Sequence, residues 1–502
     1  MELLLLLFLF LHIHPTLSGS LPEYQALLSV KAAITDDPQR ALTSWNASTN
    51  HCTWTHVTCD PSSYHVTALN LSGLNLSGTL SPDLAHLRFL SRLSFGANQL
   101  SGNIPGELGS LVSLKYMNLS SNMLTGKIPS SFAELKNLTL LSLLTNQLQS
   151  AIPEFIGDLP EIEVLQLSAN SFTGSIPQGL GKSGKLRLLD LSSNKLTGTL
   201  PPNLCTGNRL QSLFTMQNFL FGPIPETLGK CESLILILMG QNYLNGSIPR
   251  GLLGLPRLSA VFLEDNNLTG GFPETDTIAV SLVVISLYNN QLSGPLPPSI
   301  GNFSGLQDLS LDRNRFSGAI PSQIGRLQYL VGLGLSHNKL SGPIPPEISQ
   351  CKNLTDVDLS QNELAGKIPN DITKMKNLNY LNLSRNHLVG RIPALIESMQ
   401  NLTSVDFSYN NLSGYVPATG QYVHFKPTSF QGNADLCGPY VRPCKDGVAK
   451  STAASMTGTE FCSALVVLSL CVCGTLFCSV SWYIAGFVPQ KDVRETANRR
   501  NT

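Results

Sequence analysis

Two pairs of cysteines with identical spacing lie near opposite ends of this chain. Cys52 and Cys59 are the first and last residues of CTWTHVTC, and Cys437 and Cys444 are the first and last residues of CGPYVRPC. Thiols at such spacing could form disulfides or bind a metal ion. Neither pair is accompanied by CxxC motifs or a histidine cluster, so we predict two disulfides and no metal site.

Twelve asparagines stand in the N-x-S/T sequence that accepts N-linked glycans. They are Asn46, Asn70, Asn75, Asn118, Asn137, Asn245, Asn267, Asn302, Asn353, Asn382, Asn401 and Asn411. An apolar run from Leu3 to Leu11, followed by small residues, predicts a signal peptide over residues 1–20. The chain is therefore expected to enter the secretory pathway and become a glycoprotein.

Catalytic motifs are not found in this sequence. It has no glycine-rich nucleotide loop, no VAIK, HRD or DFG of a kinase, no G-x-S-x-G and no HExxH. The 33 basic and 33 acidic residues cancel, so a nucleic-acid partner has no electrostatic support. We expect a binding protein without enzymatic activity and without a cofactor.

The elements that must position any binding residues are set by a repeat. Asparagine recurs at a constant interval, at Asn98, Asn122, Asn146 and onward to Asn410, inside versions of LxxLxLxxNxLxGxIP. Such a period predicts a leucine-rich repeat solenoid. An earlier coil, Val66 to Leu90, keeps the leucines but has Leu74 at the asparagine position. We count about fifteen coils over residues 66–424.

The period has a physical reason. One coil is too small to bury its own leucines, whereas stacked coils form a continuous core and pair their LxL segments as a parallel sheet. The asparagine side chain both donates and accepts hydrogen bonds, so it can satisfy loop backbone groups inside the stack. The GxIP segment turns the chain toward the convex side.

The fold predicted is a β-rich α/β leucine-rich repeat solenoid of plant-type 24-residue repeats, capped at both ends, plus one transmembrane helix. Cys205 and Cys231 lie at nearly the same place in consecutive coils, so they are candidates for a lateral disulfide. The predicted segments outside the repeats are an N-terminal cap (21–65), a C-terminal cap (425–445), an extracellular linker (446–460), a transmembrane helix (461–488) and a short cytosolic tail (489–502). Basic residues after the span place the repeats outside the cell.

Side chains on the concave face follow from strand alternation. Residues six and four positions before each repeat asparagine point away from the core. In the middle coils these and nearby positions are largely apolar, and they predict an apolar contact surface on the exposed sheet. The candidate ligand-binding residues are Phe214, Met216, Leu236, Leu238, Phe262, Glu264 and Tyr288. Two alternatives to a contact surface remain open, which are loss of an ancestral ligand and coverage by a glycan.

Several segments resemble a known family. ALLSVKAAI, SWN and CTWTHVTCD near the start, FAELKNLTLLSLL within the coils, and FQGNADLCGPYVRPCKDG at the end are similar to plant leucine-rich repeat receptor-like kinases of the CLAVATA/BARELY ANY MERISTEM (BAM) group. The resemblance runs from Leu21 to about Lys450. It implies a plasma-membrane receptor for secreted CLE-type peptides that works with a short leucine-rich repeat co-receptor kinase.

Three features depart from that family. The kinase motifs are not found, and several coils are skipped between the second and third repeats. The family segment CESLxRxRMGEN, whose arginines bind the free carboxylate of the peptide, corresponds here to CESLILILMGQN, with Leu236 and Leu238 at the arginine positions. Leucine cannot form the bidentate hydrogen bonds that arginine makes with a carboxylate. We therefore predict weak binding of CLE-type peptides.

The main hypothesis is a single-pass plasma-membrane receptor-like protein with extracellular repeats and no kinase of its own. Its concave face would bind a secreted peptide or protein, together with a co-receptor, so that it acts as a decoy or modulator. One alternative is a truncated gene model or splice form of a BAM-like receptor serine/threonine kinase. Another is an inhibitor of wall enzymes.

Overall fold

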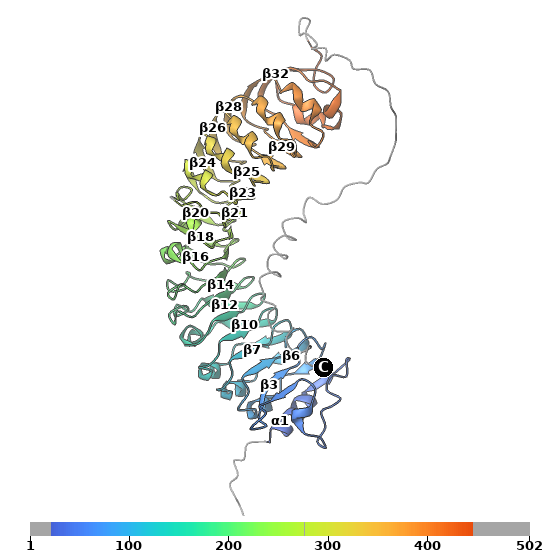
Figure 1. Ribbon diagram of the computed structural model, residues 1–502, viewed down its shortest axis with the longest axis vertical. Coiled ribbons are helices and arrows are strands. Elements are labelled where there is room, and N and C mark those ends of the chain that lie inside the picture. Colours follow the sequence, from blue (N-terminus) through green and yellow to red (C-terminus); the bar gives the residue numbers. More distant parts are fainter. Residues whose placement is uncertain (1–21, 276, 445–502) are drawn as a thin grey trace, which may run out of the picture. The chain divides into compact units, whose positions relative to one another are not determined.

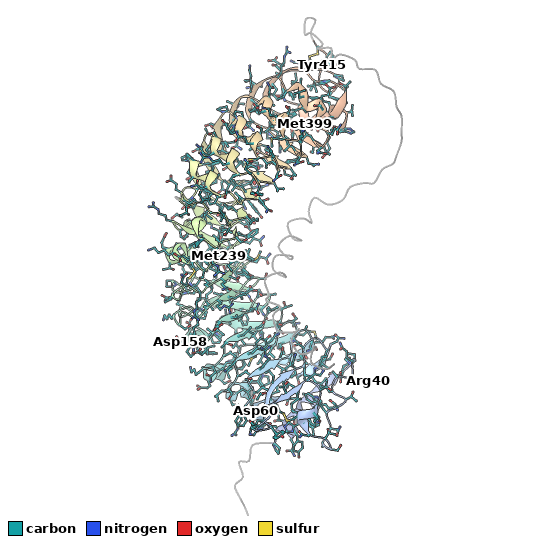
Figure 2. All side chains as sticks on the ribbon, in the orientation of Figure 1. Arg40, Asp60, Asp158, Met239, Met399 and Tyr415 are labelled. Carbon is teal, nitrogen blue, oxygen red and sulfur yellow. A yellow bond between two sulfur atoms is a disulfide. The ribbon has the colours of Figure 1, made fainter. Side chains whose placement is uncertain are left out.

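The computed structural model describes residues 22–275 and 277–444. Within them the repeats stack into one curved array, from α1 (Glu23–Ala33) near the start to the C-terminal coils (Figure 1). The side chains line this array along its whole length, and the labelled Met239 belongs to the buried core (Figure 2). The leucine-rich repeat solenoid predicted from the period is confirmed.

One 16-stranded sheet forms the concave side. Its strands are β2 (Val57–Cys59), β3 (Val66–Asn70), β5 (Arg92–Ser94), β7 (Tyr116–Asn118), β9 (Leu140–Ser142), β11 (Val164–Gln166), β13 (Leu188–Asp190), β15 (Ser212–Phe214), β17 (Leu236–Leu238), β19 (Ala260–Phe262), β21 (Val284–Ser286), β23 (Asp308–Ser310), β25 (Gly332–Gly334), β27 (Asp356–Asp358), β29 (Tyr380–Asn382) and β31 (Ser404–Asp406). The first strand, β2, joins antiparallel, and fifteen parallel strands follow, one for each predicted coil.

A second row of short strands runs along one flank, in sheets of seven, three and seven strands. These are β1 (Ile34–Asp36), β4 (Ser77–Thr79), β6 (Gln99–Asn103), β8 (Met123–Gly126), β10 (Gln147–Ala151), β12 (Ser171–Ser175), β14 (Lys195–Thr197), β16 (Phe221–Pro223), β18 (Tyr243–Ser247), β20 (Asn267–Thr269), β22 (Ser293–Pro295), β24 (Arg315–Gly318), β26 (Lys339–Gly342), β28 (Glu363–Lys367), β30 (His387–Gly390), β32 (Asn411–Tyr415) and β33 (Asp435–Cys437). Apart from β1, which belongs to the N-terminal cap, they start one to three residues after the position of the repeat asparagine, in a part of the motif that the sequence did not predict to be extended.

Most coils carry a short 3₁₀ helix on the convex side, just after the Pro of the repeat motif. The 3₁₀ helices in the described part of the chain are η1 (His51–Thr53), η2 (Pro82–His86), η3 (Gly106–Ser110), η4 (Ser130–Glu134), η5 (Glu154–Asp158), η6 (Glu226–Lys230), η7 (Leu252–Gly254), η8 (Pro298–Asn302), η9 (Ser322–Arg326), η10 (Pro346–Gln350), η11 (Asn370–Lys374), η12 (Ala394–Ser398), η13 (Gly420–His424) and η14 (Pro427–Phe430). Five residues or fewer leave no room for the two turns of an α-helix, so the tighter 3₁₀ form suits these segments.

The repeat asparagines form a ladder of buried hydrogen bonds through the stack. In the ninth coil, Asn266 Nδ2 donates to the carbonyls of Met239, Leu263 and Glu264 at 3.0, 3.1 and 3.2 Å. Its Oδ1 accepts from the Leu244 N–H of the coil before, at 3.0 Å. One side chain thus satisfies backbone groups of two coils, as expected for an amide that both donates and accepts.

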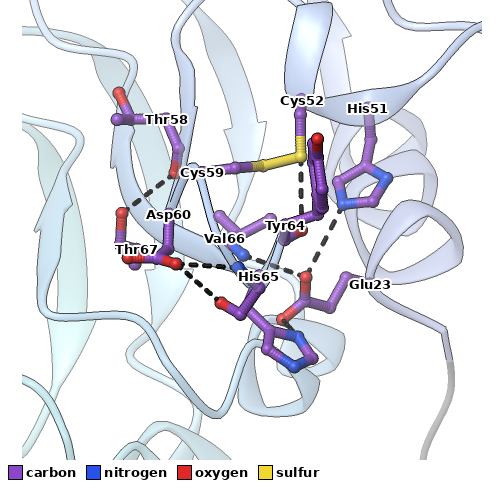
Figure 3. A network of polar contacts seen from close by, with 11 residues as sticks. Glu23, His51, Cys52, Thr58, Cys59, Asp60, Tyr64, His65, Val66 and Thr67 are labelled. Carbon is purple, nitrogen blue, oxygen red and sulfur yellow. Dashed lines mark hydrogen bonds and ion pairs between the residues drawn. A yellow bond between two sulfur atoms is a disulfide. The ribbon is translucent and has the colours of Figure 1, made fainter.

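The N-terminal cap covers one open end of the core. Cys52 and Cys59 form a disulfide, and Trp45 stacks on Trp54 with ring centroids 5.6 Å apart. The carboxylate of Glu23 accepts the Val66 N–H at 2.9 Å, which attaches α1 to the first coil (Figure 3). His51 lies beside the two cysteines, and both sulfurs belong to the disulfide, so neither is a free thiolate that could bind a metal ion.

The C-terminal cap continues the ladder rather than only covering it. Asn433 accepts the Leu412 N–H at 3.0 Å and donates to the Phe407 carbonyl at 3.0 Å, in the manner of a repeat asparagine. β33 pairs with β32 in parallel, and Cys437 is bonded to Cys444. The cap is therefore a partial sixteenth coil closed by a disulfide.

The predicted lateral disulfide lies within the described residues, whereas the predicted membrane segment does not. A disulfide joins Cys205 to Cys231, and it links two consecutive coils. Among residues 22–275 and 277–444, no helix is long and apolar enough to span a membrane. The predicted signal peptide, the linker, the transmembrane helix at 461–488 and the cytosolic tail all lie outside the described residues.

Candidate functional site

The candidate site lies on the concave sheet across β15, β17, β19 and β21. These strands pair in register, so Leu213, Ile237 and Val261 lie side by side and point into the core, where each is fully buried. Alternation then turns the first and third residue of each strand to the concave face. The same positions were expected on that face from the sequence.

Those concave side chains form an apolar cluster that is separate from the main core. Its buried members are Phe214, Leu236, Leu238 and Ala260. Three half-buried side chains pack against them, namely Met216, Phe262 and Val284. We call these seven residues the concave apolar cluster. It contains five of the seven candidate residues chosen from sequence.

The cluster differs from the predicted exposed patch in its burial. Leu236 is only 2% exposed and Leu238 only 3%. Neighbouring strands lie about 4.8 Å apart, so bulky apolar side chains on three successive strands cover one another. The accessible part of the cluster is its rim, which consists of Met216, Phe262 and Val284.

Glu264 lies on the same coil as the rim residue Phe262. Its side chain is 8% exposed, and its Oε2 has no hydrogen-bond partner within the described part of the chain. Burial raises the pKa of this carboxyl, against smaller opposing contacts from its own backbone and from Ser286. Gly240 leaves the space that this side chain needs, because a Cβ there would lie 2.6 Å from Glu264 Oε1. A buried carboxyl oxygen without a partner, beside apolar side chains, can accept a hydrogen bond from a ligand.

Tyr288 belongs to the next coil and lies outside the apolar cluster. Burial raises the pKa of its hydroxyl to about 12, and the negative charges of Asp265 and Glu264 add to the effect. The hydroxyl therefore stays protonated and can act as a hydrogen-bond donor at neutral pH.

Two aspartates further along the concave face were not identified from the sequence. Burial raises the pKa of Asp308 and of Asp312, and Asp312 Oδ1 accepts the Ser336 N–H at 2.8 Å. Both carboxyls lie over glycines of the next coil, since a Cβ at Gly332 or Gly334 would come within 2.7 Å of them. The segment DLSLDRN is followed one coil later by GLGLSHN, and the two glycines of the second segment are the sequence signal for these buried aspartates.

The twelve glycosylation candidates occupy different surroundings. Asn118, Asn302 and Asn382 are half-buried, and the other nine are exposed. In Asn137, Asn302, Asn353 and Asn401 the Nδ2 donates to a backbone carbonyl of an earlier coil, at 2.8–3.1 Å. No side-chain hydrogen bond is found in the described part of the chain for Asn245, Asn267 or Asn411, so these three side chains are free.

Comparison with family models identifies the two parts of the fold. The leucine rich repeat N-terminal domain matches residues 20–60. The Leucine Rich Repeat model matches seven separate segments, which are 113–135, 185–206, 281–303, 305–327, 329–351, 353–375 and 377–399.

Solved structures of plant receptors match most of the described chain. A TDR receptor is 39% identical with a TM-score of 0.69, and the match covers 72% of this chain and 62% of that one. The plant peptide hormone receptor RGFR1 in complex with RGF2 is 32% identical with a TM-score of 0.63, over 73% of this chain and 62% of that one. The PEPR1–AtPEP1 structure is 30% identical with a TM-score of 0.66, over 83% of this chain and 68% of that one.

Curated relatives match over shorter stretches. The first eight are receptor protein kinases and receptor-like kinases from rice and Arabidopsis thaliana, and they are 36–45% identical to this chain. Each alignment covers 12–18% of this chain and 5–12% of the relative. This chain therefore matches only a small part of each curated protein.

Proposed function

We propose that this chain, which belongs to the plant leucine-rich repeat receptor-kinase-like ectodomains, binds a secreted peptide on its concave face. The observation that carries the proposal is the concave apolar cluster. The cluster lies on the face of the sheet opposite the main core. Its rim of Met216, Phe262 and Val284 remains partly accessible. An apolar surface of this kind is typical of a contact site.

The chemistry around the cluster defines the ligand more closely. Leu236 and Leu238 offer no guanidinium group, so nothing at these positions can pair with a free carboxylate. Glu264 has an unpartnered carboxyl oxygen, and Asp308 and Asp312 lie further along the same face. We infer a peptide that places an apolar side chain on the cluster and a hydrogen-bond donor or basic group toward these acids.

The relatives support the peptide class of ligand. RGFR1 is described as a peptide hormone receptor, and its structure holds the peptide RGF2. The sequence resemblance to the BAM group adds a short co-receptor kinase as a second partner of this chain. That partner is part of the proposal, with the C-terminal coils as its docking place.

We also propose that the protein is held in the plasma membrane by residues 461–488, with the repeats outside. The support is a charge-free apolar stretch followed by Lys491, Arg494, Arg499 and Arg500. Protease added to intact cells should digest the repeats and leave a C-terminal tag intact. A tag that is digested from outside, or a chain released wholly into the medium, contradicts this placement.

Two modes of action are compatible with a peptide-binding ectodomain. As a decoy or modulator, the protein captures the ligand within a receptor complex. As part of a BAM-like receptor kinase, it passes the signal to a cytosolic kinase. A transcript read across the codon for Val488 separates them, because only the second continues into kinase coding sequence.

The ligand itself can be found without assuming its identity. A library of random peptides displayed with free or amidated C-termini is selected on the purified full chain. We expect the enriched peptides to share an apolar residue near a basic or amide-bearing residue, in either C-terminal form. Enrichment of peptides that require a free C-terminal carboxylate would contradict the proposed chemistry.

A further inference from the structure

Three aromatic side chains are exposed together on the flank of the array, away from the concave face. Phe219 is 47% exposed, Phe221 50% and Tyr243 53%. The rings of Phe219 and Tyr243 stack with centroids 6.2 Å apart and planes inclined by 17°. We call these three residues the aromatic platform. A group of large apolar side chains exposed to solvent often marks a surface that contacts another group.

The strand register places a glycosylation sequon beside this platform. Phe221 pairs with Tyr243 across β16 and β18, and Pro223 pairs with Asn245. Tyr243 and Asn245 are two residues apart on β18, with the fully buried Leu244 between them. Alternation therefore puts the Tyr243 ring and the Asn245 amide on one exposed face, with Cα atoms roughly 6.6 Å apart.

Asn245 is also free to carry a substituent. Its side chain is exposed and makes no hydrogen bond within the described part of the chain. Asn401 is different, because its Nδ2 donates to the Lys376 carbonyl at 2.8 Å. Gly246, the middle residue of the N-G-S sequon, has φ +73° and no side chain that would stand between the amide and solvent.

We propose that Asn245 carries an N-linked glycan whose first N-acetylglucosamine packs on the aromatic platform. One face of that sugar ring carries C–H groups, which are apolar and slightly positive, and they complement the negative face of an aromatic ring. The occupant is thus supplied by this chain's own sequon. None of the three platform residues belongs to the concave apolar cluster.

Attachment of the glycan requires one transfer reaction. In the secretory pathway, Asn245 Nδ2 forms a bond to C1 of the sugar of a lipid-linked oligosaccharide diphosphate. The bond from C1 to the phosphate oxygen breaks, the lipid diphosphate leaves, and Nδ2 loses one proton. Asn245 is exposed and makes no side-chain hydrogen bond within the described residues, so attachment of the sugar removes none of those bonds.

The test uses the full chain secreted from cells that make high-mannose glycans. Glycopeptide mass spectrometry should find Asn245 occupied. An N-glycosidase should release this glycan from the folded protein about two- to tenfold faster after Phe221→Ser or Tyr243→Ser, because stacking no longer holds the sugar. Glycans on coils away from β18 and β20, such as those at Asn46 and Asn411, serve as the internal reference for each rate, whereas Asn267 is left out because it pairs with Asn245.

The matched control is Met123→Ser. Met123 is an exposed apolar residue at the same repeat position as Tyr243, directly after a ladder asparagine, and its strand has no sequon. This variant should leave the release rate at Asn245 unchanged. A bare Asn245 in the secreted chain overturns the proposal. Equal release rates in the native chain and both platform variants overturn it as well.

Discussion

Introducing Leu236→Arg together with Leu238→Arg should raise the affinity for a CLE-type peptide with a free C-terminal carboxylate by up to about 100- to 10,000-fold. Each charge-assisted hydrogen bond contributes roughly 1.5–3 kcal/mol, so two arginines contribute about 3–6 kcal/mol. Both positions face the concave side on β17, next to one another across Ile237. Their long apolar stems can cross the cluster and bring the guanidinium groups into the groove.

Calorimetry on the native chain and the double variant measures this gain. The native chain should bind the peptide weakly or not at all at micromolar concentration. An amidated peptide should gain little, because only the carboxylate accepts the bidentate fork. The control pair Val164→Arg and Gln166→Arg occupies the same positions on β11 and should have no comparable effect. Tight binding by the native chain that requires the free carboxylate would mean that the peptide end is held by another coil.

Replacing Asn266 by alanine should lower the free energy of unfolding by about 3–6 kcal/mol. The substitution removes four hydrogen bonds and leaves buried backbone groups of two coils without partners. Each unsatisfied buried group costs roughly 1–3 kcal/mol, and relaxation of the stack recovers part of that cost. Urea denaturation, followed by fluorescence, reports the change.

The adjacent Asn267 provides the control for this substitution. It is exposed and makes no side-chain hydrogen bond within the described part of the chain. With N-glycans removed enzymatically from all samples, Asn267→Ala should change the unfolding free energy by less than about 0.5 kcal/mol. Equal effects of the two substitutions would show that the ladder does not stabilise the stack.

The solenoid fold could be predicted from the sequence because every coil has the same structural requirements. Each coil must bury leucines and satisfy its loop, so the same residue types return once per coil. Asn433 was missed because it falls one position short of the regular interval after Asn410 and lies in a segment that resembles a cap. The residue before each regularly spaced asparagine, from Asn98 to Asn410, has φ of 52–58°, and this was not predictable either. Ala97, Tyr409 and other types with no preference for this region occupy it, since the ladder on either side holds the backbone there.

The site was predictable in its positions but not in its environment. Strand alternation identified Leu236 and Leu238 as concave residues, because alternation depends only on the local strand. Their burial depends on side chains of the coils on either side. The lack of a partner for Glu264 Oε2 and the space over Gly334 also depend on neighbouring coils. The aromatic platform has the same origin, since Phe221 and Tyr243 meet only through the register of two coils.

The most direct test of the concave apolar cluster as a ligand site is calorimetry with a peptide selected on the native chain. Phe262 and Gln166 occupy the same repeat position, both are half-buried, and only Phe262 belongs to the cluster. We predict that Phe262→Asp weakens binding by roughly 100-fold or more, because a charge replaces an apolar contact. Gln166→Asp should change the affinity by less than about threefold. Binding that Phe262→Asp leaves unchanged would show that the ligand lies elsewhere on the sheet.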